Sequence, residues 1–240
     1  VKVYDDNRIT IAGQNNRYNA VYLDGAVDND VFGLSSTGLD GGQVGGNPFT
    51  FDELDQISVS VAPMDVRQSG FAGGAINATT KSGKNEMTGS LYWFTRNEKL
   101  AGKTASYNDL NRSKLPEFNA NRYGASLGGA LVENKLFYYF TYEKEKIETP
   151  NPYDFSSYRG NSKVADIERL LQVLENKYNY NPGSYGNNTS TMDKDVFVGK
   201  LDYNFMQNQS LSFKYKLSNF NSFQAATSGG SLNFIDRTVL

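Results

Sequence analysis

Residues 197–218 read FVGKLDYNFMQNQSLSFKYKLS and contain two segments, 197–205 and 210–218, in which apolar and polar residues alternate. Successive side chains of a β-strand point to opposite faces, so each segment predicts a strand with one apolar and one polar face. The four residues between the segments have the length of a turn, and the pair therefore predicts a β-hairpin. The apolar faces carry Phe197, Gly199, Leu201, Tyr203 and Phe205 in the first strand and Leu211, Phe213, Tyr215 and Leu217 in the second.

A second hairpin is predicted upstream, from residues 122–131 and 136–144, which are joined by the short segment Val132–Lys135. Its return strand is dense in tyrosine and phenylalanine, as in the aromatic girdles of membrane barrels. Residues 89–96 predict a further strand, whose two faces are ambiguous because apolar residues occupy consecutive positions.

The connections between these five strands alternate in length. About 25 residues separate the first two strands and about fifty separate the third from the fourth, whereas the other two connections have about four residues each. Outer-membrane barrels have short periplasmic turns and long extracellular loops. A soluble antiparallel β domain is the alternative, but it would need a second layer to cover its apolar faces, and the sequence offers none. We therefore expect an antiparallel transmembrane β-barrel.

The longest connection contains residues 163–178, where apolar residues recur at helical spacing. This pattern predicts a short amphipathic helix in an extracellular loop. The helix either packs on residues of its own loop, which is the interpretation we favour, or binds a partner. The recurring residues are Val164, Ile167, Leu170, Leu171 and Leu174.

The charge balance changes close to residue 86. Residues 1–86 contain 6 basic and 11 acidic residues, whereas residues 87–240 contain 18 basic and 15 acidic residues. The first part is also rich in glycine and in short strand-like runs. We therefore expect one domain over 1–86 and the first barrel strands, about five, over 87–240.

Several functions are disfavoured by composition. The chain has neither cysteine nor histidine, which excludes disulfides, thiolate nucleophiles and Ser-His triads. A net charge of -2 without a basic run disfavours nucleic acid as a partner. No stretch approaches the roughly 18 apolar residues of a transmembrane helix. Asp52, Glu53 and Asp55 fit the first turn of a helix better than a catalytic carboxylate pair. We predict no enzyme, no catalytic residue and no cofactor.

Three motifs of the first part resemble the plug domain of TonB-dependent outer-membrane receptors. They are RYNAVYLDG (17–25), FDELDQISVSV (51–61), which resembles a helix-turn-strand, and GFAGGAINATTKSG (70–83). Their order, followed at once by barrel hairpins, is more specific than any one of them. The resemblance implies a mainly β fold, in which a plug of mixed α/β character lies inside a barrel of about 22 strands. Oar-like members are the most similar subgroup, through residues 11–19, 29–34, 62–71, 96–103 and 133–139.

The resemblance also implies a function. It describes a receptor in the outer membrane of a Gram-negative bacterium that imports a bulky nutrient, such as a chelate, a glycan or a peptide. Its partners would be outer-membrane lipid, an extracellular ligand, TonB in the periplasm through a segment upstream of residue 1, and a surface lipoprotein as a further candidate. Oar-like members raise an alternative, a structural or adhesive outer-membrane protein without transport.

Two candidate sites follow from the plug interpretation. Asp28, Asn29, Asp30 and Phe32 follow an Asp-Gly turn and would contact substrate in an apical loop, although a purely structural loop is the simpler interpretation. The Asp-x-Asp spacing suggests calcium, but the glycine and late glutamate of an EF-hand loop are missing, so we predict no metal site. Arg67 is a candidate for an ion pair between the plug and a barrel carboxylate.

Overall fold

The computed structural model describes residues 2–3, 9–11, 13–30, 32–35, 37–39, 41–44, 46–47, 49–61, 73–101, 117–151, 155, 158–183, 185 and 188–224. The chain divides into two compact units, described separately below. The first unit comprises residues 1–95, 121–146 and 192–221. The second comprises residues 96–120, 147–191 and 222–240.

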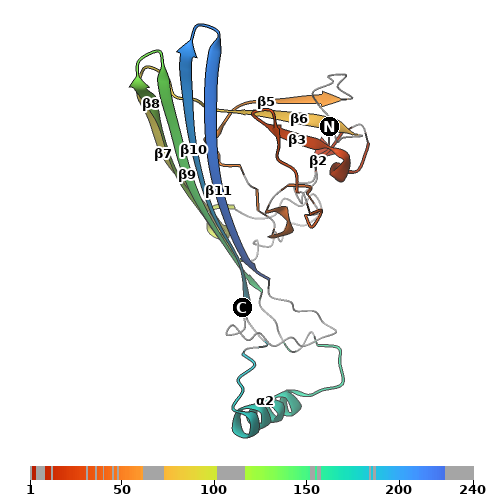
Figure 1. Ribbon diagram of the computed structural model, residues 1–240. Coiled ribbons are helices and arrows are strands. Elements are labelled where there is room, and N and C mark those ends of the chain that lie inside the picture. The colour runs from red at the N-terminus through yellow and green to blue at the C-terminus, as the bar shows by residue number, and fades with distance from the viewer. Residues whose placement is uncertain are drawn as a thin grey trace. The chain divides into compact units, whose positions relative to one another are not determined.

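Five long strands form one sheet in which spatial neighbours are also neighbours in sequence, in the order β11-β10-β9-β8-β7 (Figure 1). We call this sheet the wall. It confirms the five predicted strands and both hairpins, and every strand is longer than its predicted segment. The bounds are β7 (Thr88–Asn97), β8 (Asn119–Val132), β9 (Leu136–Asn151), β10 (Asn188–Met206) and β11 (Gln209–Phe223).

One face of the wall carries an apolar band. On β10 the band runs from Phe197 to Phe205, and Asp195 lies on the same face beyond its end. Eight steps of about 3.3 Å, tilted by about 40°, give a height of roughly 20 Å, which is close to the lipid-facing band of membrane barrels. The ambiguous faces of β7 are resolved as well, since Leu91 is 87% exposed and Tyr92 points to the opposite face, where it contacts Glu143. We call the banded face outward and the other face inward.

The strands are longer than the predicted segments because hydrogen bonding between neighbouring strands continues beyond the apolar band. On β9 the outward residues change from Tyr142 to Lys144, and on β10 from Phe197 to Asp195. Alternation of apolar and polar residues ends there, whereas the backbone ladder does not.

A second, four-stranded sheet precedes the wall, in the order β4-β3-β6-β5. Its strands are β3 (Ala20–Leu23), β4 (Ala26–Val27), β5 (Leu54–Val61) and β6 (Gly74–Thr80). β3 pairs in parallel with β6, and the other two pairs are antiparallel. Asp24 and Gly25 have φ of 51° and 86°, as a two-residue hairpin turn with positive φ at both positions requires. We call residues 9–83, which contain this sheet and its loops, the N-terminal segment.

Close packing in this sheet depends on Gly74. A Cβ at this position would lie 2.8 Å from the Ser60 carbonyl oxygen and 2.6 Å from a methyl carbon of Ile11. The buried cluster Ala20, Tyr22 and Ala75 lies on the opposite face of the sheet. Two short 3-10 helices, η1 (Asn16–Tyr18) and η2 (Gly42–Val44), and the small strands β1 (Lys2–Val3) and β2 (Ile9–Thr10) complete the described elements before the wall.

The prediction of a helix-turn-strand over residues 51–61 is wrong in its helix. Residues 51–53 form a turn, and β5, which contains Asp55, begins at Leu54. The carboxylates of Asp52 and Glu53 do not lie on the first turn of a helix. Glu53 instead accepts a hydrogen bond from the backbone N–H of Thr50 (3.1 Å) and closes the turn.

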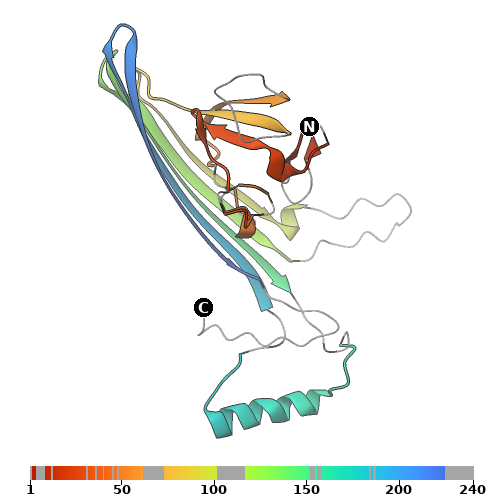
Figure 2. The same ribbon diagram turned by 45° about the vertical axis from the view of Figure 1, so that its right-hand side comes forward.

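The second unit contains the described helices α1 (Glu98–Ala101) and α2 (Val164–Tyr178) (Figure 2). α2 confirms the helix predicted at 163–178. Its start is capped by Asp166, whose carboxylate accepts from the Lys163 N–H at 2.8 Å. Asn179 ends it in the left-handed conformation, with φ of 50°. Ile167 is the buried residue of the helix, whereas Leu170 remains half exposed.

Candidate functional site

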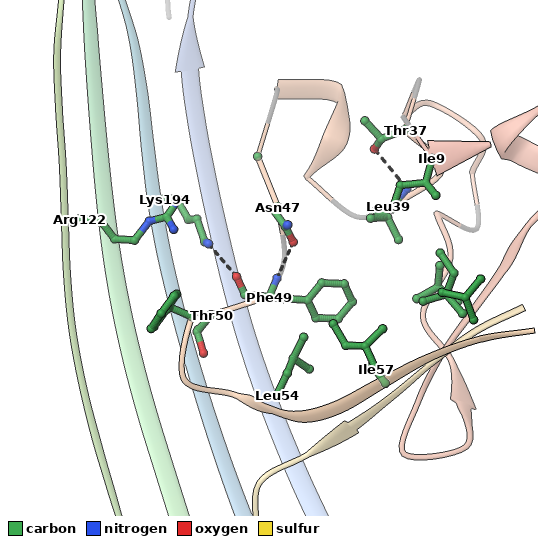
Figure 3. Close-up of a pocket in the computed structure, with 16 residues that line it drawn as sticks. Ile9, Thr37, Leu39, Asn47, Phe49, Thr50, Leu54, Ile57, Arg122 and Lys194 are labelled. Atoms are coloured by element: carbon green, nitrogen blue, oxygen red, sulfur yellow. Dashed lines mark hydrogen bonds between the residues drawn. The ribbon is translucent and has the colours of Figure 1, made fainter. Parts of the chain in front are cut away.

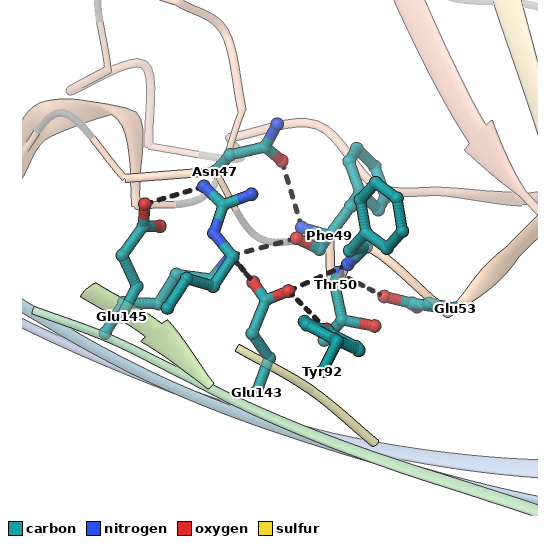
Figure 4. Close-up of polar contacts among 10 residues, drawn as sticks. Asn47, Phe49, Thr50, Glu53, Tyr92, Glu143 and Glu145 are labelled. Carbon is teal, nitrogen blue, oxygen red and sulfur yellow. Dashed lines mark hydrogen bonds and ion pairs between the residues drawn. The ribbon is translucent and has the colours of Figure 1, made fainter. Parts of the chain in front are cut away.

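The wall holds the N-terminal segment through a buried carboxylate on β9. Glu143 is fully buried and accepts hydrogen bonds from the Phe51 backbone N–H (2.9 Å), the Tyr92 hydroxyl (2.7 Å) and the Lys194 ammonium (2.7 Å) (Figure 4). Lys194, also buried, donates to the Phe49 carbonyl oxygen at 2.9 Å. Glu143 and Lys194 are therefore bound both to each other and to further groups by hydrogen bonds of normal length. A buried ion pair is tolerated when its charges are satisfied in this way. All these residues belong to the first compact unit.

Asp52 is held by the inward residues of three neighbouring strands. Its carbonyl oxygen accepts from the Tyr139 hydroxyl at 2.6 Å. Its carboxylate accepts from the hydroxyls of Ser90 and Ser126 and from the Lys81 ammonium. Burial alone would raise the pKa of Asp52, but these donors outweigh it and hold the pKa below its usual value.

Arg122 extends the charged set along the inward face. Its guanidinium lies 2.6 Å from the Glu145 carboxylate and 3.9 Å from that of Glu143. With Lys194, this places acids and bases in alternation on adjacent strands. The inward charges of β8, β9 and β10 at this level therefore neutralise one another.

β11 contacts the N-terminal segment through two lysines. The Lys214 ammonium lies 3.0 Å from the Asp24 carboxylate. The Lys216 ammonium lies 3.6 Å from Asp28 and 3.8 Å from Glu53, and 4.6 Å from the centre of the Phe49 ring.

The two acids at either end of this group have opposite pKa shifts. Burial would raise the pKa of Asp24, but hydrogen bonds from Thr80 and Lys214 lower it below its usual value. Glu53 is fully buried, and its burial raises its pKa despite the attraction of Lys216 and the Thr50 N–H. Asp24 is thus stabilised as an anion, whereas ionised Glu53 is not.

A cavity of about 590 Å³ lies beside the turn at residues 49–53 (Figure 3). One face of the four-stranded sheet, with Val21, Ile57, Val59 and Ile76, forms its apolar side. Asn47, Arg122 and Lys194 form a polar end.

The residues predicted to contact substrate take different roles. Asn29 holds the start of β3, accepting from the Val21 N–H (2.8 Å) and donating to the Asn19 carbonyl (2.9 Å). Asp30 accepts from the backbone of Phe32 and Ser35 and shapes its own loop. Asp28 faces Lys216. Phe32 is 85% exposed and is the member of the set whose side chain is open to a ligand.

Arg67 lies outside the described residues. The ion pairs described between the N-terminal segment and the wall have carboxylates in the segment and lysines in the wall, at Lys214 and Lys216. The excess of acid before residue 86 and of base after it is the sequence signal that agrees with this polarity. Sequence reasoning missed Glu143 and Lys194, which occupy polar positions of alternating strands without any motif.

The described residues contain no group of acidic side chains that could hold a metal ion. Among the same residues, no helix is long and apolar enough to cross a membrane.

Comparison with known proteins identifies the fold. A family model described as an outer membrane beta barrel domain matches residues 79–159. The siderophore receptor PirA from Acinetobacter baumannii superposes with a TM-score of 0.55 at 17% identity, over 92% of this chain and 26% of PirA. The ferric enterobactin receptor PfeA of Pseudomonas aeruginosa, in complex with enterobactin, gives a TM-score of 0.56 at 16% identity, over 98% and 29%. The chain has the fold of a TonB-dependent receptor.

A sequence relative supports the same assignment. The TonB-dependent transporter Oar of Myxococcus xanthus is 24% identical over 141 residues, which are 56% of this chain and 12% of Oar. The chain thus spans between about an eighth and a third of the length of the TonB-dependent receptors that it matches. These relatives are transporters and receptors, not enzymes. The TonB-dependent receptor fold and the barrel domain place the chain in the outer membrane of Gram-negative bacteria.

Proposed function

We propose that this chain belongs to a TonB-dependent transporter that imports a bulky nutrient through a plugged barrel. The observation that carries the proposal is that inward residues of the wall form hydrogen bonds with the turn at 49–53. Glu143 and Lys194, both buried, bind backbone atoms of that turn. Polar contacts of this kind place a folded segment against the wall and can break and form again, whereas a continuous apolar core would make the two inseparable.

In this proposal the N-terminal segment is the later part of the plug. The plug ends near residue 86 and the barrel begins near residue 87. TonB would bind a segment upstream of residue 1, and a surface lipoprotein is a candidate partner on the extracellular side.

The loop after the Asp24-Gly25 turn would contact the ligand. Asn29 and Asp30 fix its backbone, and the exposed Phe32 and Leu34 then project from a preformed loop. Two large apolar side chains favour a ligand with an apolar or aromatic portion. A chelate, a glycan or a peptide all satisfy this condition, and PfeA in complex with enterobactin is one example of a chelate receptor.

The test is growth and uptake on defined nutrient sources after deletion of the full-length gene. The deletion strain is complemented with the wild type, with a version lacking the upstream TonB-binding segment, or with a Phe32→Ser variant. We expect a defect on one nutrient that the wild type alone restores fully. Normal growth on every source, with altered adhesion or envelope integrity instead, would refute import and support a structural role.

A further inference from the structure

The five strands of the wall hold the N-terminal segment in two different ways. β9 and β10 bind its backbone, at the Phe51 N–H and at the carbonyl oxygens of Phe49 and Asp52. β7 and β8 bind the Asp52 carboxylate through the hydroxyls of Ser90 and Ser126. Each of these groups is bound by a hydrogen bond, so this part of the contact is the stronger one.

The ring of Phe220 lies against Gly41 and Gly46 of the N-terminal segment. Among the contacts described, β11 makes its polar contacts only with side chains. Its two lysines face Asp24, Asp28 and Glu53, and the two contacts of Lys216 are longer than hydrogen bonds. The Lys216 ammonium and one carboxylate oxygen each of Asp28 and Glu53 are buried without a hydrogen-bond partner among the described residues. Buried charges without hydrogen bonds are costly, so this side of the contact is the weaker one.

The two parts of the wall also differ in the charges that would be unpaired if the N-terminal segment moved away. Glu143 pairs with Lys194, and Glu145 with Arg122, so the β8–β10 part of the wall neutralises its own charge. The inward positions of β11, at the even residues from 210 to 222, contain Lys214 and Lys216 and no acid. Their counter-ions are the carboxylates of the N-terminal segment, so movement of the segment would leave two ammonium groups facing the lumen.

We propose that the N-terminal segment separates from β11 while it stays attached to β7–β10. We propose also that the cargo is an anion, which passes through the space opened at β11 and binds Lys214 and Lys216 on its way. This inference rests on the proposed function and names its substrate class. Carboxylate, phosphate or chelate oxygens of the cargo replace those of Asp24, Asp28 and Glu53 on the two lysines. Replacement of one anion by another avoids leaving the ammonium groups unpaired.

The experiment compares two serines on inward positions in the full-length protein, in intact cells. Ser218→Cys reports on β11 and Ser126→Cys on β8. Neither change alters a charge, and in the Ser126→Cys variant Asp52 keeps its bonds to Ser90, Lys81 and Tyr139. The probes are methanethiosulfonates of similar size, one with a sulfonate and one with a trimethylammonium group. Rates are normalised to those of the same variant unfolded in urea, and are measured with and without a proton-gradient uncoupler.

We expect energised cells to label the Ser218→Cys variant faster than uncoupled cells, with the sulfonate favoured over the cation on the order of 10-fold. That factor corresponds to two unit charges acting across several ångströms in a wet lumen. The additional change Lys216→Met should reduce the preference several-fold without abolishing labelling. The Ser126→Cys variant should show no energy-dependent change.

Three results would overturn the inference. Energy-dependent labelling that is as strong at Ser126→Cys as at Ser218→Cys would show that the whole segment leaves the wall, and would leave the proposed importer intact. A preference for the cation at Ser218→Cys would exclude an anionic path. If neither variant responds to energisation and growth on all nutrients is also normal, then the importer fails together with the path.

Discussion

The ion pair between Glu143 and Lys194 can be tested against a matched pair one residue away on both strands. Glu143 and Lys194 are inward and buried, whereas Lys144 and Asp195 form an outward pair 3.2 Å apart that is partly exposed. Both pairs join β9 to β10. A difference between their variants therefore reports the surroundings of the pair and not its place in the sheet.

The expected magnitude follows from burial. Glu143→Gln leaves the Lys194 ammonium, with 1% of its side chain exposed, without its counter-ion and weakens the bond to the Phe51 N–H. Breaking one partner of a buried pair costs about 3–5 kcal/mol, whereas an exposed pair contributes about 0–1 kcal/mol. We expect Glu143→Gln to reduce the free energy of opening of the turn at 49–53 by about 3 kcal/mol, and Asp195→Asn to change it by less than about 1 kcal/mol.

Hydrogen exchange of the full-length protein in detergent measures this free energy locally. Peptides that contain Phe51 should exchange roughly 10²-fold faster in Glu143→Gln than in the wild type, because about 1.4 kcal/mol corresponds to a factor of ten. The double variant Glu143→Gln/Lys194→Met should recover most of the protection, since it removes the unpaired charge. Equal acceleration by Asp195→Asn, or a double variant as unprotected as the single one, would refute the reasoning.

Four further predictions use the same protein. The pKa of Asp24 lies below its usual 3.8. The stability that ionised Asp24 gives the fold is therefore present above about pH 4 and is lost as the pH falls through the lowered pKa. In urea unfolding at pH 7, Asp24→Asn should lower the free energy of unfolding by about 1–2 kcal/mol. The pKa of Glu53 is raised above 4.5, so ionisation destabilises the fold at pH 7 and this cost disappears on acidification; in the same assay Glu53→Gln should not destabilise at pH 7. Gly74→Ala should lower the unfolding free energy of the N-terminal segment by about 1–3 kcal/mol, seen as protease sensitivity with the barrel intact. Leu201→Arg, within the apolar band, should cost about 2–4 kcal/mol in barrel refolding into lipid vesicles, against about 0–1 kcal/mol for Asp193→Arg beyond it.

The wall was predictable because its signal is local. Alternation over residues 197–205 and 210–218 fixes which side chains face lipid, and the alternating connection lengths indicate which ends carry loops. The strand ends were not predictable, because above the apolar band both faces of a strand are wet and the alternation disappears. The turn at 51–53 was misassigned because acids near the start of a helix and acids that accept tertiary hydrogen bonds look alike in a sequence.

The hydrogen bonds between the wall and the turn at 49–53 could not have been derived from sequence. Phe51 and Glu143 are separated by 92 positions, and Glu143 and Lys194 by 51. Polar residues are expected at all inward positions of a barrel strand, so nothing marks these two among the others. Their role depends on which inward residues face the N-terminal segment, and that is a property of the assembled fold.

The two faces of the wall also constrain each other. Side chains alternate along a strand, so a shift of one residue in the pairing of β9 would exchange its inward and outward sets. Glu143 would then lie on the outward face at the edge of the apolar band, and Tyr142 would enter the lumen, where it carries no negative charge to pair with Lys194. The larger cost would be that of Lys194, left as an unpaired buried ammonium. The lipid-facing pattern therefore also fixes the position of the polar groups that hold the N-terminal segment.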